Sequence, residues 1–264
     1  MSTLFITFGC SWTAGVGSAY YDGMPIGLYE EMTKIGPSVE DTRLHDANAY
    51  RTVLSTKYDL VNLNFSQGGS SNQRQWRLAK EYFGSTAYKN DKENYSNIIV
   101  LHAITSTARN EFYVKSFGGI VNKLFSNCKF EEELFPSFIE FSYDHNHEVK
   151  QLVTEMLFWN QFYESQNIKH VWVDTLNHHS YNTSVPNLLN DDGAQRDLLS
   201  MLCFRNGMKT PDSKYHKSTW QVDTNRVPYL VEKKILNPHS YHPTKEGHIQ
   251  IADYLSPSIE ALLT

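Results

Sequence analysis

The sequence predicts an α/β fold, a three-layer α/β/α arrangement around a mostly parallel, flavodoxin-like sheet. Two observations carry this prediction. Short apolar runs that end in small or polar residues alternate with longer segments of helical period, and such alternation favours parallel strands covered by helices on both faces. In addition, the 264 residues are 40% hydrophobic and 20% charged, which is typical of a globular chain with a sizeable core.

Four buried strands are predicted, because four short apolar runs are each bounded by glycine, serine, threonine or asparagine. They span Leu4–Phe8, Tyr58–Leu63, Asn97–His102 and His170–Asp174. The carboxyl ends of parallel strands meet at one edge of a sheet, and ligands bind beyond that edge. We therefore expect the four strand ends to form one functional rim.

Helices are predicted where apolar residues recur three or four positions apart. These segments are Ala47–Lys57, Ser71–Phe83, Val149–Gln166 and Thr244–Leu263. In the last of them Thr244 is the expected N-cap and Pro257 an expected kink or stop.

Two segments, at about 21–46 and 175–236, keep no period. We interpret both as insertions within a single domain spanning residues 1–264. The second precedes the C-terminal histidine loop and is far longer than an ordinary connection, so we expect it to cover the rim.

Composition excludes several classes of function. A net charge of −5, with no long lysine or arginine block, argues against nucleic acid as a partner. No apolar run approaches the roughly 20 residues of a membrane span, and no export signal is visible. Three scattered cysteines form neither a disulfide framework nor a structural zinc pattern. We expect a cytoplasmic protein, in the host cytoplasm if the chain is viral, with no membrane partner. The sequence does not predict the oligomeric state.

The stretch FGCSWTAG follows the first predicted strand. Gly9 permits a sharp bend that places Ser11 on a turn above the sheet, and a helix starting near Thr13 would direct its N-terminal amides toward negative charge near the hydroxyl. A serine hydroxyl is a poor nucleophile until a base takes its proton. The C-terminal stretch HSYHPTKEGH offers His242, whose backbone is restrained by Pro243 just before the last helix.

These stretches resemble the SGNH (GDSL-type) hydrolase family of esterases, thioesterases and carbohydrate deacetylases. Gly9–Thr13 stands where the family has Gly-Asp-Ser-x-Thr, and His242 with Pro243 stands where it has Asp-x-x-His-Pro. The resemblance implies the SGNH hydrolase fold, Ser11 as nucleophile, His242 as base, and no metal or cofactor. The segment TSTARNEF is similar to a Thr-x-x-x-Arg variant of divergent members, many of them phage-encoded.

The resemblance also implies an oxyanion hole. Asn64 followed by Gly69 matches the second family block and implies that the Gly69 amide donates, together with the amide of Ser11. The third block usually supplies an asparagine. Thr105 is the best positional match here, and its hydroxyl can donate where an amide would.

Two departures from the family pattern concern the triad acid. Cys10 replaces an aspartate, and His239 stands where the acid belongs. A neutral imidazole at His239 can orient His242 but cannot offset its charge, and loss of the carboxylate costs on the order of ten-thousandfold in a serine protease. Three alternatives remain: a weak dyad, lost catalysis, or another acid, namely Asp174, Asp191 or Asp223.

Structural interpretations stand beside the functional ones. Ser11 can serve as a helix cap, and Asn64 and Gly69 can shape a turn. Cys10 fits a small buried residue as well as a rival nucleophile.

Charged residues and histidines have structural alternatives too. Arg109 and Glu111 can form an ion pair, or Arg109 can bind a substrate carboxylate or phosphate. No H-E-x-x-H pattern accompanies the paired histidines, so we expect no metal; these are His239 and His242 with His248, and His178 with His179.

The predicted function is that of a serine esterase or acylhydrolase. It would remove an acyl group such as acetyl from a carbohydrate or similar polar substrate through a Ser–His dyad or incomplete triad. Asn64, Arg109 and Trp220 are the expected substrate contacts, with Tyr215 and Arg226 of the aromatic insertion. The alternatives are a catalytically impaired SGNH-fold module that binds carbohydrate or has a structural role, and a metal-dependent hydrolase.

Overall fold

The computed structural model describes residues 2–19, 39–107, 109–114, 119–124, 144–176, 179, 181, 184–189, 197–208, 225–238 and 240–264. Within these ranges no helix combines the length and the apolar character that crossing a membrane requires.

The central sheet has four parallel strands in the order β2-β1-β3-β6. The strands are β1 (Thr3–Phe8), β2 (Leu60–Asn64), β3 (Asn97–Ile104) and β6 (Lys169–Asp174). All three pairings are parallel, so the four strands end at the same edge, as predicted. From β1 the chain passes to β2 on one side and then to β3 on the other. Strand order therefore reverses between β1 and β3, the place where open α/β sheets bind ligands.

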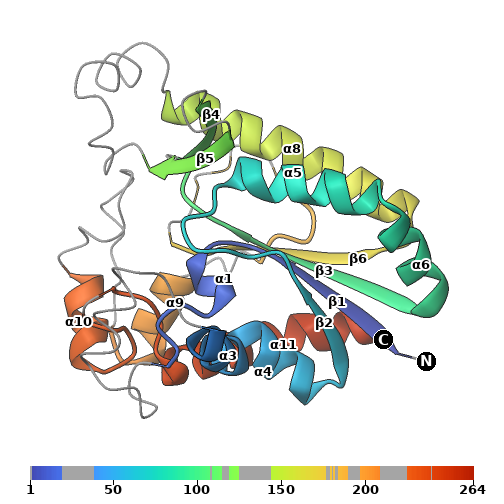
Figure 1. The fold of residues 1–264 in the computed structure, drawn as a ribbon. Helices are drawn as coiled ribbons and strands as arrows, with labels where there is room; N and C mark the ends of the chain where they lie inside the picture. Colours follow the sequence, from blue (N-terminus) through green and yellow to red (C-terminus); the bar gives the residue numbers. More distant parts are fainter. Residues whose placement is uncertain are drawn as a thin grey trace.

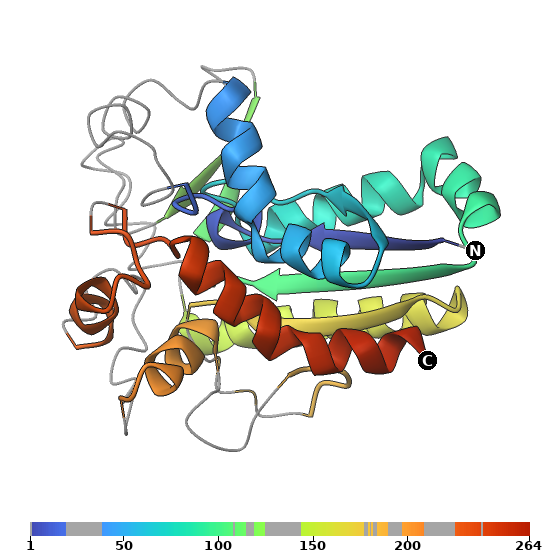
Figure 2. The ribbon, with the colours of Figure 1, turned by 90° about the horizontal axis from the view of Figure 1, so that it is seen from below.

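Helices cover both faces of the sheet (Figure 1). One face carries α5 (Asn72–Phe83), α6 (Thr86–Asn94) and α8 (His145–Ser165). The other carries α1 (Ser11–Ala14), α3 (Val39–Asn48), α4 (Tyr50–Lys57) and α11 (Lys245–Leu263), with α4 and α11 side by side (Figure 2). This is the predicted three-layer α/β/α architecture.

Three further units complete the described structure. An antiparallel pair, β4 (Arg109–Val114) and β5 (Gly119–Leu124), follows the end of β3. Helices α9 (Leu198–Arg205) and α10 (Arg226–Glu232) lie next to each other on the α11 side of the sheet (Figure 1).

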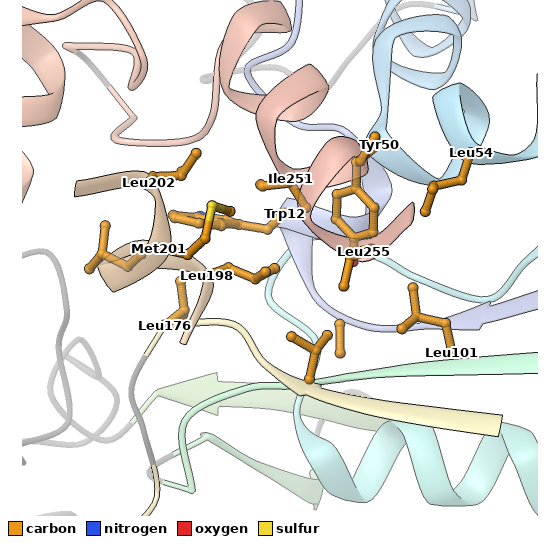
Figure 3. Packing of buried hydrophobic residues seen from close by; sticks show 14 of the residues in the cluster. Trp12, Tyr50, Leu54, Leu101, Leu176, Leu198, Met201, Leu202, Ile251 and Leu255 are labelled. Atoms are coloured by element: carbon orange, nitrogen blue, oxygen red, sulfur yellow. The ribbon is translucent and has the colours of Figure 1, made fainter. Parts of the chain in front are cut away.

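Alternation along the strands divides the core into two clusters. Phe5 faces the α4–α11 side, whereas Leu4 and Ile6 face the α5–α8 side, as period-two strands require. Trp12, directly after Ser11, is fully buried in the first cluster among side chains of α9 and α11 (Figure 3). Burial of an aromatic side chain of this size stabilises the turn that carries Ser11.

A column of stacked rings crosses the sheet on the α5–α8 side. Phe8, His102 and Trp172 occupy register-matched positions of β1, β3 and β6, with ring centroids 4.7 Å and 4.5 Å apart. The His102 Nε2 atom lies 2.7 Å from the Tyr163 hydroxyl. Burial, and then the nearby His170, lowers the pKa of His102 well below its usual range. This imidazole is therefore a neutral core group.

Several predicted boundaries differ from the structure. The Ala47–Lys57 segment is divided at Ala49, whose extended backbone caps α4. Pro257 is not a stop, since α11 continues to Leu263; the proline is solvent-exposed, and water can satisfy a carbonyl that its ring leaves without a donor. The helix expected near Thr13 begins at Ser11 and makes a single turn.

Some elements were not predicted at all, namely α3, which lies mostly in the segment 21–46, α6, α9, α10 and the β4–β5 pair. Helix α9 has the sequence LLSMLCFR, in which six residues are buried and no polar face interrupts the apolar run. Without that contrast the helical period is invisible. The described helices of the 175–236 segment thus contribute to the core.

Candidate active site

The turn that carries Ser11 is shaped by close packing. Cys10 is the N-cap residue with extended backbone, and Ser11 is the first residue of α1. A Cβ atom on Gly9 would lie 2.1 Å from Thr13 Oγ1, so only glycine fits there. Thr13 Oγ1 in turn shares a 2.8 Å hydrogen bond with the Tyr50 hydroxyl. Cys10 is fully buried, in agreement with its structural interpretation.

The loop that carries His242 is fixed by backbone pairing. Leu236 and Pro243 form an antiparallel bridge, and the Asn237 N–H donates to the His242 carbonyl at 2.8 Å. Thr244 caps α11 as predicted, because its Oγ1 accepts from the Gly247 N–H. The same hydroxyl donates to the Lys234 carbonyl at 2.8 Å, which ties the start of α11 to the end of the preceding turn.

The structure brings Ser11 and His242 together. His242 Nε2 lies 2.7 Å from Ser11 Oγ, a hydrogen bond between residues 231 positions apart. Gly17 makes this approach possible: it has φ +89°, and a Cβ there would lie 2.6 Å from the His242 Cβ. Ser11 is only 6% exposed, whereas His242 is half-buried, so the hydroxyl is better shielded from water than the ring.

Burial decides the charge of His242. The pKa of the imidazole is lowered to about 4, chiefly by burial and next by the charge of Arg109. A smaller contribution from His45 acts in the same direction, and a backbone hydrogen bond at Ser240 partly offsets these effects. Within the described part of the chain, Arg109 is the charged side chain that lowers this pKa most. At neutral pH the ring is uncharged and can accept the Ser11 proton, but its low pKa makes it a weak base.

Of the acids considered for His242, Asp174 is the one that the structure describes. It is buried at the end of β6, where Oδ1 accepts from the Tyr181 hydroxyl at 2.7 Å and Oδ2 from the His179 N–H at 3.1 Å. These bonds give it a role in holding the loop after β6. His239, Asp191, Asp223, Tyr215, Trp220 and His178 lie outside the described residues, so their predicted roles stay predictions.

The expected oxyanion donors differ in accessibility. Gly69 is exposed with φ +72°, and no atom lies within 4 Å of a Cβ built on it, so its backbone faces open space. Thr105 follows β3, the neighbour of β1, and is 1% exposed. Its Oγ1 has no hydrogen-bond partner among the described residues.

Asn72 holds Thr105 from both sides, a contact that sequence reasoning missed. Its Oδ1 accepts from the Thr105 N–H and its Nδ2 donates to the Thr105 carbonyl, each at 2.9 Å. Gln75, one turn along α5, donates to the Ala103 carbonyl at 3.0 Å. The available signal was asparagine directly after the Ser71 N-cap, since asparagine in a helix favours positions where its amide bonds to backbone.

Over nearly its whole length, the chain is similar to solved structures of an esterase and of a lipolytic protein. One is a psychrotrophic esterase, EstA from Pseudoalteromonas sp., inhibited by monoethylphosphonate, at 11% identity and a TM-score of 0.40 over 100% of this chain and 99% of that chain. The other is described as a lipolytic protein of the G-D-S-L family from Desulfitobacterium hafniense DCB-2, at 10% identity and a TM-score of 0.35 over 97% and 99%.

No family model matches the chain, and no curated protein matches it in sequence. With TM-scores of 0.40 and 0.35, the chemistry of this chain has to be argued from its own residues.

The predicted substrate contacts have different surroundings. Asn64 Oδ1 accepts from Thr7 Oγ1 at 3.2 Å and from the Ser66 N–H at 2.9 Å, which is turn geometry. Arg109 is half-buried, and its Nη1 donates to the Ser70 carbonyl at 3.5 Å.

Two predicted contacts, the Arg109–Glu111 ion pair and the contact of Arg226 with substrate, are wrong. Glu111 pairs with Arg77 at 2.8 Å rather than with Arg109, because α5 lies against β4 and presents Arg77 there. Arg226 is not a substrate contact; it is fully buried, donates to Ser200 Oγ at 2.8 Å and faces Asp197 at 3.6 Å. Burial of an arginine requires such partners, so this one joins α10 to α9.

His248, another described histidine near the site, has a structural role. His248 Nδ1 accepts from the Tyr50 N–H at 3.3 Å, and burial lowers the pKa of the ring to about 3. Across the described part of the chain, no cluster of three or more histidine, cysteine, aspartate or glutamate side chains could hold a metal ion.

Proposed function

We propose that this protein is a serine ester hydrolase. Ser11 Oγ attacks the ester carbonyl while His242 Nε2 takes its proton, and the protonated ring then returns that proton to the departing alcohol. A water molecule, deprotonated by the same ring, releases the acid from Ser11. The observation that carries this proposal is the 2.7 Å hydrogen bond between His242 Nε2 and Ser11 Oγ, at the carboxyl ends of the strands.

The oxyanion of the tetrahedral intermediate would be stabilised by three donors. We assign the backbone N–H groups of Ser11 and Gly69 and the Thr105 hydroxyl. Support comes from placement: Ser11 follows β1, Gly69 follows β2 and Thr105 follows the adjacent β3. A hydroxyl that is buried and unpartnered among the described residues can donate to new negative charge without first breaking another bond.

Turnover is expected to be slow. Among the described residues, the imidazolium formed during acyl transfer is opposed by the nearby charge of Arg109. In a serine protease, loss of the triad carboxylate lowers the rate by about ten-thousandfold. We infer a Ser–His dyad or incomplete triad, and a polar substrate such as an acetylated carbohydrate.

Two observations favour a second candidate, a catalytically impaired module that binds carbohydrate or has a structural role. The pKa of His242 is low, and Ser11 is 6% exposed, so little of the serine is accessible to an ester. Both features fit a Ser–His pair that no longer catalyses a reaction as well as they fit a slow enzyme.

Covalent labelling separates the two candidates. A fluorophosphonate probe should add one adduct to Ser11, found by intact mass and peptide mapping, and Ser11→Ala should abolish it. Cys10→Ala is the matched control, since it changes the neighbouring residue but leaves the hydroxyl. An adduct that persists in Ser11→Ala, or an unlabelled protein that still binds glycans, would decide against the hydrolase.

A further inference from the structure

A cavity of about 650 Å³ lies between α5, α8 and the start of β4. Asn72 and Trp76 of α5 line one wall, Glu148 and Leu152 of α8 the other, and Arg109 of β4 one end. The N-terminal parts of α5 and α8 both lie toward the edge at which the parallel strands end (Figure 1). The cavity therefore lies toward the same edge of the sheet as the Ser11–His242 pair, on the opposite face.

Two lining residues connect the cavity with the candidate active site. Asn72 holds the backbone of Thr105 through two 2.9 Å hydrogen bonds. Arg109 is close enough to His242 for its charge to lower the pKa of that imidazole. Arg109 therefore belongs both to the lining of the cavity and to the charged surroundings of His242.

Arg109 is a half-buried cation whose guanidinium forms no ion pair within the described chain. Its one hydrogen bond there is the 3.5 Å contact with the Ser70 carbonyl, since Glu111 is taken by Arg77. The first turn of α5 contains no acidic residue. A planar guanidinium, weakly hydrated and partly shielded from water, is well suited to bind carboxylate or phosphate.

The opposite wall has a different character. Glu155 faces Lys80 at 3.7 Å, and burial raises the pKa of Glu148. Trp76 and Leu152 are both nearly fully buried and give the cavity an apolar floor. The opposite wall also carries His147 and Lys150, both exposed. Arg109 is the half-buried cation of the lining and the one near His242, so we place the anion-binding end there.

We propose that this cavity binds an anionic part of the substrate, a carboxylate or phosphate group carried close to the scissile ester, with Arg109 as its contact. The proposal rests on the proposed hydrolase function and narrows its substrate class from polar esters to anionic ones. Arg109 is then a specificity-determining residue. The apolar floor accommodates the carbon skeleton between the anionic group and the ester.

The kinetic test compares esters matched in everything except charge. Mono(4-nitrophenyl) succinate against 4-nitrophenyl butyrate places the carboxylate on the acyl side, and 4-acetoxybenzoate against phenyl acetate places it on the leaving group. We expect Arg109→Gln to lower the anionic-to-neutral ratio of kcat/KM by about tenfold or more in one pair, as for loss of a charge-assisted hydrogen bond. Arg109→Lys should restore part of the ratio.

Lys92→Gln is the matched control. It removes an exposed cation of α6 whose hydrogen bond goes to the Gln166 side chain, at the opposite end of the sheet (Figure 1), and should leave the ratio unchanged. A ratio that moves less than twofold in Arg109→Gln for both pairs would overturn the proposal. Equal losses for anionic and neutral esters would overturn it as well, since they would assign Arg109 to the reacting centre.

A binding test separates failure of this proposal from failure of the hydrolase. In a Ser11→Ala background, calorimetric titration with benzoate and with phenyl phosphate should show binding that weakens about tenfold with Arg109→Gln, while benzyl alcohol binds less tightly. The stronger of the two anions identifies carboxylate or phosphate. If neither anion binds more tightly than the alcohol, the anion site is absent, whether or not the wild-type protein turns over esters.

Discussion

Replacing Thr105 by valine tests the proposed oxyanion hole most directly. Valine keeps the branched shape of threonine and removes Oγ1, which has no partner among the described residues. Removing a buried hydroxyl that makes no hydrogen bond should leave the free energy of unfolding unchanged or raise it by up to about 1 kcal/mol. Loss of one oxyanion donor lowers kcat by about 100- to 1000-fold. In Thr105→Val, kcat should therefore fall steeply while the free energy of unfolding does not decrease.

The assay pairs two measurements on the same protein preparations. Chemical denaturation gives the free energy of unfolding, and hydrolysis of a chromogenic ester gives kcat. Thr105→Ser is the matched control, because it keeps the hydroxyl and removes only the methyl group. It should retain most of the activity and lose about 1 kcal/mol of stability for the missing methyl.

Two outcomes would refute the reasoning. If Thr105→Val keeps kcat within threefold of wild type, the hydroxyl does not donate to the reacting oxygen. If instead the variant loses 2 kcal/mol or more of stability, Oγ1 makes a structural hydrogen bond and its burial has no catalytic meaning. Equal losses in Thr105→Ser and Thr105→Val would assign the effect to packing.

Three further predictions concern the same site. The kcat/KM value should stay constant down to pH 5.5. At that pH an imidazole with a pKa of about 4 is about 97% neutral, whereas one with the ordinary pKa is about 9% neutral. A pH profile of kcat/KM checks this, and a loss of activity centred near pH 6.5 would mean that a carboxylate supports His242. Because the pKa of folded His242 lies below its unfolded value, stability falls as pH drops from 6.5 toward 4, so denaturation at pH 5.5 must accompany the profile. Gly17→Ala should lower kcat at least tenfold, since its Cβ would overlap the His242 Cβ at 2.6 Å. Gly207→Ala is the control: it is also at positive φ, but its Cβ would lie 3.5 Å from the nearest atom, so it should cost only about 1 kcal/mol of stability. Similar kcat values in both variants would contradict the role of Gly17 in the approach of His242 to Ser11. Asn72→Ala should lower kcat more than Gln75→Ala at comparable loss of melting temperature, because Asn72, unlike Gln75, bonds to both the N–H and the carbonyl of Thr105. A parallel decline of both variants would reduce Asn72 to a structural role.

Much of the fold was predictable because local patterns carry it. The runs Leu4–Phe8 and Asn97–His102 are apolar and short, and each became a buried parallel strand. The segment before Leu263 has apolar residues at helical spacing and a threonine cap, and became α11. Helices without a polar face, such as α9, could not be predicted, because a uniformly apolar run has no period to detect.

The candidate site divides in a similar way. The FGCSWTAG turn and the His-Pro loop were recognisable, and the structure brings Ser11 and His242 to within 2.7 Å. The pairing of Arg226 with Asp197 and the contact of Asn72 with Thr105 were not. Both join residues whose separation in sequence has no regular relation to their separation in space, so no local pattern encodes them.

The sequence by itself determined the four strands of the central sheet and the helices with a clear apolar period, and which chemical groups stand at the strand ends. These properties follow from spacing and polarity within about 20 residues. Only the tertiary structure decided which groups meet and in what charge state. Strand order placed the turn after β1 beside the loop before α11, and burial left the imidazole of His242 neutral. Both depend on packing between distant segments, because desolvation and proximity are properties of the assembled core.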